Sequence, residues 1–433
     1  MFKRILSAIL SVTVLSATAI SVGAVSVNEV QESDIAEIKT IKPIIKNNIV
    51  TYYDENGNEV DITAENREIE VNTALPESFD LRDYGRTTSV RNQGTEGLCW
   101  DFGATASIES NILSNPELSA KLGDNAWENL DLSEAGNSWY LHTNIEDESS
   151  VLYGEYIDDY SKGANGGNAH MIAMGFSSGY GMYPEELLPY SEWNNGYSET
   201  LRYYSDYRFK DFNVYDKDNK ELVKQKLMEN GALVVSYNCF YSNYNEVDGW
   251  EAYYDYGVPL DGNNNLGHLA AIVGWDDNFS KEYFHSEMQP ENNGAWLCKN
   301  SWGEEEGCTK KGYEGYFWMS YETDLSEISQ FEVQSVDEFD NIYQNQVNSS
   351  NYMENVVSSA NVFTAKSDEE LEQICFANYG SSDFTVEIYK LADNYSSPVD
   401  GKCIASFESS VDFTGAHCIE CPENIYIEKG DIF

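Results

Sequence analysis

The sequence predicts an α+β fold in which a mixed helix-and-strand domain is followed by a β-sandwich. After Cys99, apolar residues recur at four-residue spacing (Ala104, Ile108, Ile112), which fits an amphipathic helix that Pro116 ends. Residues 232–237 and 267–275 are apolar runs typical of buried strands. Farther on, residues 384–389 alternate apolar and polar side chains, as a half-buried strand does.

Length and composition indicate a folded protein of two to three domains. The chain has 433 residues, of which 41% are hydrophobic and 13% aromatic, more than a disordered chain carries. The formal net charge is −48, and no tract of basic residues interrupts it. Nucleic acid and anionic membranes would repel such a chain, so both are excluded as partners.

The first residues have the layout of a secretory signal peptide, residues 1–24. Lys3 and Arg4 precede an apolar stretch over residues 5–20, and small residues lead to a cleavage point after Ala24. The stretch is too short for a spanning helix, and no membrane span is expected once the signal is removed, although a retained anchor is the alternative. We therefore expect an extracellular protein, secreted or at the cell surface. Residues 25–74 are either an inhibitory propeptide or a linker.

Cys99 is the candidate nucleophile. It stands where a glycine-rich turn runs into the predicted helix, and unpaired N–H groups at a helix start lower the pKa of a thiol. The thiolate is the attacking species in cysteine catalysis. Gln93, six residues earlier, can donate its side-chain amide to a developing oxyanion. The alternative for a lone cysteine is a small buried hydrophobe.

A base and its orienting group follow later in the chain. Of the five histidines, His268 alone stands at the entrance of a predicted buried strand. An imidazole there can take the thiol proton and return it to the leaving amine. Asn300 can accept a hydrogen bond from the ring and fix its orientation, as an aspartate does in serine triads.

These segments together resemble the papain-like cysteine peptidases. The resemblance rests on Gln93-Gly94 with Cys99-Trp100, on Gly166-Gly167, on the segment at His268, and on Lys299-Asn300-Ser301-Trp302-Gly303. Residues 75–82 are similar to the start of the mature enzymes, and Ser133 is a candidate N-cap of the family's second helix. The resemblance implies a peptidase domain over residues 75–335, with a helical lobe and a β-barrel-like lobe.

The resemblance also implies roles. Cys99, His268, Asn300 and Gln93 would be catalytic, Gly166 and Gly167 would bind the substrate backbone, and Trp302 would cover the His268–Asn300 bond. No metal and no organic cofactor are expected.

Two features depart from the family pattern. His268 and Asn300 follow Cys99 at a longer spacing than the roughly 130–150 residues that are usual, and surface insertions over residues 115–131 and 276–293 would account for the excess. Asp101 stands where the family has a small residue, and an anion so close should raise the pKa of the thiol.

Residues 340–433 are similar to the lectin-like domain that follows this peptidase in some secreted bacterial proteins. Short strands are expected at residues 361–365, 374–378, 403–407 and 424–428, and the sandwich is expected to be incomplete as given. Cys418 and Cys421 form a Cys-x-x-Cys, for which a disulfide or an unpaired role is favoured over zinc, with the pairing left open. A carbohydrate or cell-surface ligand is the candidate partner of this domain.

The sequence therefore favours a secreted cysteine endopeptidase that hydrolyses proteins or peptides. The rival interpretation is a surface adhesin or binding protein on a catalytically silent peptidase scaffold. An acyltransferase with the same Cys–His pair would differ only in its acceptor.

Overall fold

The structure is a computed structural model of the chain. It describes residues 3–7, 39–46, 49–71, 74–146, 148, 153–154, 166–247, 250–259, 266–304, 315–336, 341–344, 352–354 and 358–433. The predicted signal peptide thus lies outside the described residues except for Lys3–Ser7, which form strand β1. Within the described part, no helix is both long and apolar enough to cross a membrane.

The helical lobe is built around α1, Cys99–Ser114, as the sequence predicts. Pro116 does not simply end this helix but opens the next one, because Asn115 caps it and proline suits the first helical turn. Ser133 caps α4 by accepting from the Gly136 N–H at 2.9 Å, which confirms the predicted cap. The helices around α1 are α2 (Pro116–Ala120), α3 (Ala126–Asn129), α4 (Glu134–Leu141) and α5 (Ala169–Ser177). Short 3-10 helices are η2 (Leu81–Tyr84), η4 (Tyr190–Asn195), η5 (Glu199–Leu201), η6 (Tyr241–Asn243) and η7 (Lys281–Tyr283).

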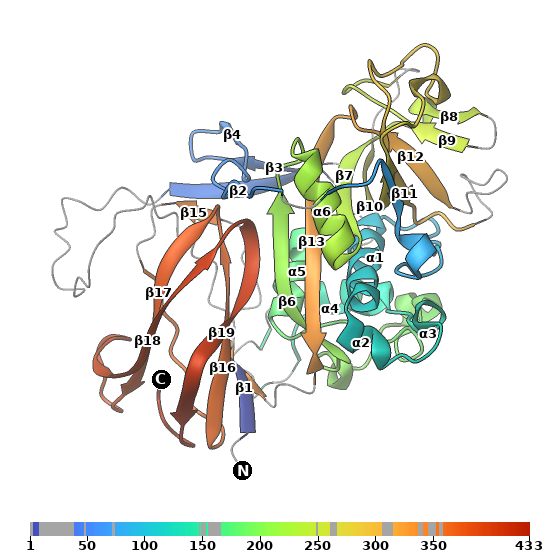
Figure 1. Ribbon diagram of the computed structural model, residues 1–433. Helices are drawn as coiled ribbons and strands as arrows, with labels where there is room; N and C mark the ends of the chain where they lie inside the picture. Colours follow the sequence, from blue (N-terminus) through green and yellow to red (C-terminus); the bar gives the residue numbers. More distant parts are fainter. Residues whose placement is uncertain are drawn as a thin grey trace.

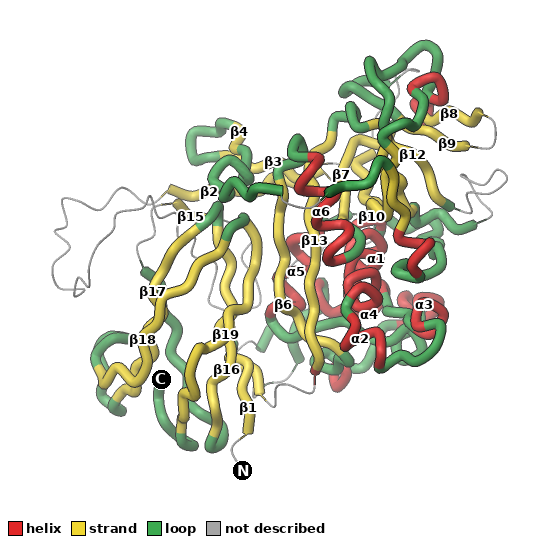
Figure 2. The backbone as a smooth tube through the Cα atoms, in the orientation of Figure 1, coloured by secondary structure: helices red, strands yellow, loops and turns green. Residues whose placement is uncertain are grey.

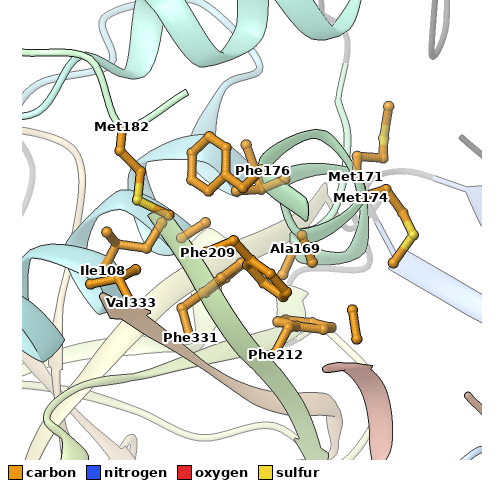
Figure 3. Close-up of a cluster of buried hydrophobic side chains, with 14 of the residues drawn as sticks. Ile108, Ala169, Met171, Met174, Phe176, Met182, Phe209, Phe212, Phe331 and Val333 are labelled. Carbon is orange, nitrogen blue, oxygen red and sulfur yellow. The ribbon is translucent and has the colours of Figure 1, made fainter. Parts of the chain in front are cut away.

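Helix α1 is buried on almost every side, so its sequence is selected for close packing as well as for amphipathicity. A Cβ atom on Gly103 would lie 3.4 Å from Cβ of Leu269, which shows how closely the helix approaches strand β10 (Leu266–Asp276). On its other faces Ile108 joins a core with Phe209, Phe331 and other side chains of α5 and the neighbouring strands (Figure 3). This packing fixes the start of α1 against the strand that carries His268.

Within its described residues, the β lobe is built on an open sheet and contains no closed barrel. Strand β13 pairs with β7 on one side and with β6 on the other, and β6 pairs in turn with β19 of the C-terminal domain. The edge at which a barrel would close is therefore taken by the next domain (Figures 1 and 2). The strands and the helix of this lobe are β5 (Ser78–Asp80), β6 (Tyr207–Tyr215), α6 (Lys220–Asn230), β7 (Leu233–Cys239), β8 (Tyr244–Val247), β9 (Trp250–Tyr253), β10, β11 (Ala295–Lys299), β12 (Tyr316–Ser320) and β13 (Leu325–Ser335).

The C-terminal domain has two β layers around its own apolar core. The β17–β18 pair covers the β16–β19 pair, and Leu371, Ala405 and Ile425 are buried between them. The predicted strand at residues 361–365 is instead a single bridge, Thr364 with Ile432, which ties the chain's last residues to this core. The strands are β14 (Asn341–Ile342), β16 (Glu369–Asn378), β17 (Ser382–Leu391), β18 (Gly401–Val411) and β19 (Thr414–Ile427), with β1 between β14 and β16.

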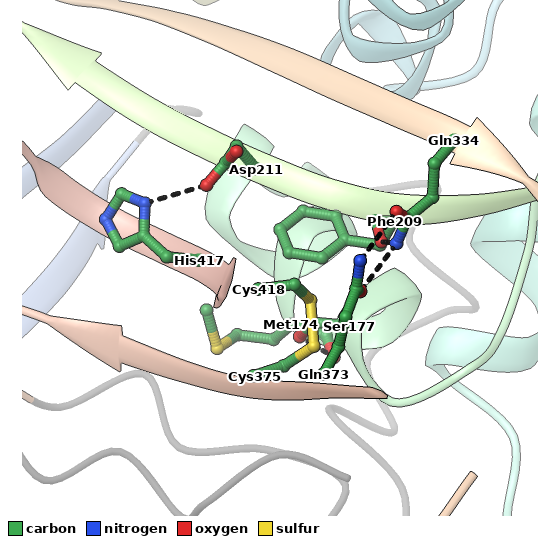
Figure 4. Close-up of a disulfide and its surroundings, with 9 residues drawn as sticks. All are labelled: Met174, Ser177, Phe209, Asp211, Gln334, Gln373, Cys375, His417 and Cys418. Carbon is green, nitrogen blue, oxygen red and sulfur yellow. Dashed lines mark hydrogen bonds and ion pairs between the residues drawn. A yellow bond between two sulfur atoms is a disulfide. The ribbon is translucent and has the colours of Figure 1, made fainter. Parts of the chain in front are cut away.

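A disulfide joins Cys375 of β16 to Cys418 of β19, opposite residues in this strand pair. Figure 4 shows it packed beside Met174 of α5, where the two domains meet. Cys421, the other member of the Cys-x-x-Cys, takes no part in a disulfide, so the motif is not a local pair. The register of the strands decides this pairing, and the sequence motif does not reveal it.

Residues 39–46 and 49–71, which precede the peptidase domain, include a small sheet. Strands β2 (Lys39–Lys46), β3 (Ile49–Tyr53) and β4 (Glu59–Val60) form a small antiparallel sheet with β15 (Tyr352–Glu354). Ile41, Tyr52 and Ile62 are buried in the same core as the helical lobe. These residues therefore pack onto the domain that follows them.

Candidate active site

Cys99 is the first residue of α1 and is almost fully buried, with 2% of its surface exposed. The backbone N–H groups of Leu269, Trp100 and Cys99 itself act on its sulfur and lower the thiol pKa. Burial is the larger effect and raises this pKa to about 11, because a thiolate loses its hydration there. The lowered thiol pKa expected from the helix start is therefore outweighed in this structure.

His268 lies in β10 directly before Leu269, so the N–H at the sulfur of Cys99 comes from the residue next to this histidine. The His268 Nε2 atom is 2.8 Å from Oδ1 of Asn300. Oδ1 also accepts the Ser301 N–H at 2.8 Å, which fixes it as the amide oxygen. His268 must then donate from Nε2, and its Nδ1 is left as the basic nitrogen of the neutral ring.

Burial also sets the charge of the imidazole. His268 is 4% exposed, and desolvation lowers its pKa to about 4, against the opposing effect of the Asn300 bond. Trp302 stacks on the ring with centroids 5.0 Å apart and planes at 27°. The resting pair is therefore a neutral thiol with a neutral imidazole, and the indole of Trp302 shields the ring from water.

Gln93 is held by Ser301, a residue whose role the sequence did not reveal although it lies inside the Asn-Ser-Trp-Gly motif. The Ser301 hydroxyl donates to Oε1 of Gln93 at 2.5 Å, and the Gln93 N–H donates to the Ser301 carbonyl at 2.8 Å. Nε2 of Gln93 donates one hydrogen to the Glu96 carbonyl at 2.7 Å. An amide nitrogen has two hydrogens, so a second donor remains for another acceptor.

The glycine pair lies beside the aromatic residue that follows Cys99. Gly166 has φ +118°, which L side chains rarely adopt, and a Cβ on Gly167 would lie 2.5 Å from the ring of Trp100. A side chain at Gly167 would therefore displace Trp100. The preceding residues 163–165, which the sequence pattern includes, lie outside the described residues.

Asp101 does not face the sulfur. Its carboxylate accepts from Asn137 at 3.1 Å and from Thr105 at 3.2 Å, both inside the helical lobe. It is fully buried, and desolvation raises its pKa well above the ordinary value. Asp101 is also absent from the groups that shift the pKa of Cys99. The expectation that a charged Asp101 raises the pKa of Cys99 is therefore wrong for this structure, where burial of the thiol is the largest cause.

A buried charged network lies behind the site and was missed by sequence reasoning. Lys299, the neighbour of Asn300, donates from Nζ to Thr88 Oγ1 at 2.8 Å, and Thr88 donates in turn to Glu109. Glu109 accepts the Leu132 N–H at 2.9 Å with its other oxygen. Glu134 nearby is 5% exposed, and its pKa is raised by burial and by Glu109. A cavity of about 10 Å³, room for roughly one water, is lined by Glu109, Glu134, Lys299 and Asn300.

The described residues hold no group of three or more His, Cys, Asp or Glu side chains arranged to bind a metal ion. The site is therefore described by its side chains and backbone donors alone.

Comparisons with known proteins show which protein families this chain resembles. The sequence profile described as "Papain family cysteine protease" matches residues 75–129 and 140–336, more than half of the chain, and "Lectin like domain" matches residues 342–433. Among curated proteins, "Probable cysteine protease RD19B" of Arabidopsis thaliana is 27% identical over 235 residues, which are 54% of this chain and 56% of that protein. "Testin-2" of Rattus norvegicus is 27% identical over 242 residues, 55% of this chain and 60% of that protein. The chain thus spans about three-fifths or less of the length of these relatives.

Solved structures show the same fold. The cysteine protease and lectin-like domains of Cwp84, a surface layer associated protein of Clostridium difficile, match 86% of this chain and 76% of that chain with a TM-score of 0.62 and 22% identity. A structure of Cwp84 after propeptide cleavage matches 82% of both chains with a TM-score of 0.61. On the profile match, this chain belongs to the papain family of cysteine proteases.

Proposed function

We propose that the chain is a secreted cysteine endopeptidase that hydrolyses peptide bonds with Cys99 as nucleophile. The observation that carries the proposal is the His268 Nε2–Asn300 Oδ1 bond of 2.8 Å, capped by Trp302, next to a strand N–H that reaches the sulfur of Cys99. This arrangement leaves Nδ1 of His268 as a base whose tautomer is fixed by its partner.

The reaction starts from the neutral pair. His268 Nδ1 takes the thiol proton as the sulfur forms a bond to the substrate carbonyl carbon. The resulting oxyanion accepts from the second hydrogen of Gln93 Nε2 and from the Cys99 N–H. When the C–N bond breaks, the imidazolium returns its proton to the leaving amine, and a thioester remains on the sulfur.

Water completes the cycle. His268 takes a proton from a water molecule, the hydroxyl adds to the thioester carbonyl, and the C–S bond breaks to release the acid and restore the thiol. Asn300 is a positioning residue, because it acts through the ring that it orients. The substrate is proposed to lie extended along Gly166 and Gly167, where the absence of side chains lets its backbone approach.

The place of action is proposed to be outside the cell. The signal-peptide pattern of residues 1–24 supports it, and the similar Cwp84 is described as surface layer associated. Cleavage after Ala24 would remove β1 from its place beside β16. The N-terminal sequence of the chain recovered from the medium tests this, and a chain that begins at Met1 would contradict it.

The C-terminal domain is proposed to bind a carbohydrate or another cell-surface ligand. The match of residues 342–433 to a lectin-like profile supports a binding role. Binding of the whole chain to purified cell walls, compared before and after enzymatic removal of glycans, tests this role.

The rival function is a binding protein on a silent peptidase scaffold, and the burial of Cys99 with its raised pKa favours it. A peptidyl epoxide separates the two. An active site should be labelled at Cys99 about 10² times faster than a free thiol at the same pH, because positioning and base catalysis both assist attack. Peptide cleavage that stops in a Cys99→Ala variant completes the test, and labelling no faster than a free thiol would support the silent scaffold.

A further inference from the structure

We propose that His417 and Asp211 form a proton-dependent latch between the C-terminal domain and the peptidase sheet. The pair is complete only while the imidazole is charged, and loss of the proton opens the end of the ladder that joins β19 to β6. Figure 4 shows the two side chains facing each other from these strands. The latch goes beyond the proposed function and does not rest on it.

The ladder between β6 and β19 is short. It has four residue pairs, which run from Thr414 with Val214 to His417 with Asp211. Directly beyond Asp211, a bulge interrupts the pairing of β6 with β13, and a bulge bends the strand that carries it. His417 and Asp211 are therefore the last pair of the ladder. The end of a ladder opens more readily than its interior, so this pair decides whether the end stays closed.

The imidazole of His417 is bonded through both of its nitrogens. Nε2 lies 3.1 Å from the Phe413 carbonyl oxygen, which can only accept, so Nε2 carries a hydrogen. Nδ1 lies 3.0 Å from Oδ1 of Asp211. In a neutral ring with its hydrogen on Nε2, Nδ1 has no hydrogen, and an ionised carboxylate has none either. Both bonds of the ring therefore form only when it is an imidazolium.

The ring is kept from water by aromatic side chains. The His417 side chain is 5% exposed and that of Asp211 is 22% exposed. Phe376, which is paired with His417 in β16, has its ring centroid 6.0 Å from the imidazole, and Phe384 of β17 packs against Phe376 at 4.9 Å. Loss of the proton therefore leaves two acceptors facing each other beside an apolar cover, where an unmade hydrogen bond costs most.

The other charged groups around the pair come from β13, β6 and α6. Glu332 of β13 is paired with Asp211 and lies 3.7 Å from Lys210 of β6. Burial and Asp211 raise the pKa of the Glu332 carboxyl. Lys210, Lys226 of α6 and His417 act in the opposite direction. Two carboxyl groups thus lie side by side in the sheet, and the charge on His417 lies where it balances them.

The opposite end of the ladder is held by groups that do not titrate. The Thr414 N–H donates to Oδ1 of Asn66 at 2.7 Å, so residues 61–67 cover this end. The nearest charge is Asp412, which is paired with Arg67 at 3.0 Å. A rise in pH through the range in which histidines lose their charge therefore acts on one end of the ladder and leaves the other in place.

The expected change is a local opening and not a separation of the domains. A folded state that binds one proton more than the opened state becomes less stable as the pH rises. Gln334 of β13 and Gln373 of β16 still join the domains through reciprocal amide bonds of 2.9 and 3.0 Å, which Figure 4 also shows. The chain should therefore stay folded while β19 loosens from β6.

The charge of the ring is tested first. The full chain with Cys99→Ala, labelled with nitrogen-15 histidine, reports which ring nitrogens carry hydrogen, and His417→Phe identifies the signals of this residue. At about pH 6 we expect hydrogen on both nitrogens of His417, and at about pH 8.5 we expect it on Nε2 alone. A ring with the same charge at both pH values would overturn the proposal.

The opening is tested by hydrogen exchange of the amides of residues 414–418, corrected for the intrinsic effect of pH. In the parent chain we expect opening to increase about tenfold or more from about pH 6 to about pH 8.5, as for the loss of one hydrogen bond to a charged group. Asp211→Asn introduces an amide that can donate to the neutral Nδ1, so its opening should change less than about twofold. An equal pH dependence in this variant and in the parent would overturn the latch.

A second histidine–carboxylate pair supplies the control. His170 and Glu327 lie 2.9 Å apart within the peptidase domain, and Glu327→Gln removes the charge from that pair. This variant should keep the pH dependence of the parent at residues 414–418. If Glu327→Gln abolished that dependence as Asp211→Asn does, the opening would not originate at His417, and the latch would be overturned.

Discussion

Two buried polar clusters border β11 and the loop after it, and they are stabilised in different ways. On one side, His268, Asn300, Ser301 and Gln93 form neutral hydrogen bonds of fixed direction. On the other, Lys299, Glu109 and Glu134 are ionisable groups whose charges depend on one another. The first cluster therefore fixes the orientation of the side chains that would take part in the reaction. The second sets the balance of buried charges, on which the stability of the fold depends. Changes in the two should therefore have different consequences.

The largest expected effect is on activity, from Asn300→Ala. His268 would lose the acceptor that fixes its tautomer, and we expect kcat/KM to fall about 10³-fold, roughly 4 kcal/mol of transition-state stabilisation. The free energy of unfolding should fall by less, about 1–3 kcal/mol, the cost of leaving the buried His268 and Ser301 donors without their acceptor. Steady-state kinetics and denaturant unfolding check the two numbers. Loss of stability equal to the loss of activity would mean that Asn300 is structural.

Lys299→Met should show the opposite pattern. It removes a cation that is 5% exposed, so Thr88 loses a hydrogen-bond donor and Glu109 loses the positive charge near it. We expect a loss of about 3 kcal/mol in unfolding free energy. The matched variant is Lys299→Met with Glu109→Gln, which removes the uncompensated acid and should recover part of the loss. Urea unfolding of the three proteins measures the coupling. A double variant that is no more stable than Lys299→Met would show that Glu109 is already neutral.

The sequence predicted the first cluster better than the second. Cys99, His268 and Asn300 stand in short motifs whose local pattern places them at a helix start, a strand entrance and a strand end. Glu109 and Lys299 belong to no such pattern, because their pairing depends on how α1 packs against β11. The same holds for the Cys375–Cys418 disulfide and for residues 61–67, whose partners are set by strand register and domain contact. The extension of the peptidase sheet into the next domain could not be predicted for a related reason, since pairing of β6 with β19 is a property of this two-domain chain.

The dependence of unfolding free energy on pH should also distinguish the two clusters. The expected change is smaller than those for Asn300→Ala and Lys299→Met. Burial raises the pKa of Glu185, next to Asp131 and Glu109, to about 7. A carboxyl whose folded-state pKa is raised contributes stability below its unfolded value of 4.5, and this stability is lost as the pH rises through 7. His268 has the opposite sign, since its folded-state pKa is lowered from 6.5 to about 4 and stability is lost as the pH falls through that interval.

The variant Glu185→Gln tests how much the raised pKa of this carboxyl contributes to the pH dependence. Relative to the parent chain, it should gain roughly 2 kcal/mol in unfolding free energy between pH 4.5 and pH 7, a value reduced from the full shift because Glu185 is partly solvated. Thermal unfolding at a series of pH values measures the difference. A difference that does not vary with pH would show that Glu185 titrates normally in the folded chain.

The smallest effect should come from Asp101→Asn, although Asp101 is only two residues from Cys99. Burial raises the pKa of this carboxyl well above its ordinary value, which favours the neutral form, and an amide has nearly the same shape. We therefore expect changes of less than about 0.5 kcal/mol in stability and less than twofold in kcat/KM. Alkylation of Cys99 as a function of pH is the decisive measurement, because it reports the thiol itself. If Asp101 were ionised and repelled the thiolate, its replacement would move the alkylation profile to lower pH and raise the rate. An unchanged profile would locate the cause of the raised Cys99 pKa in burial of the thiol.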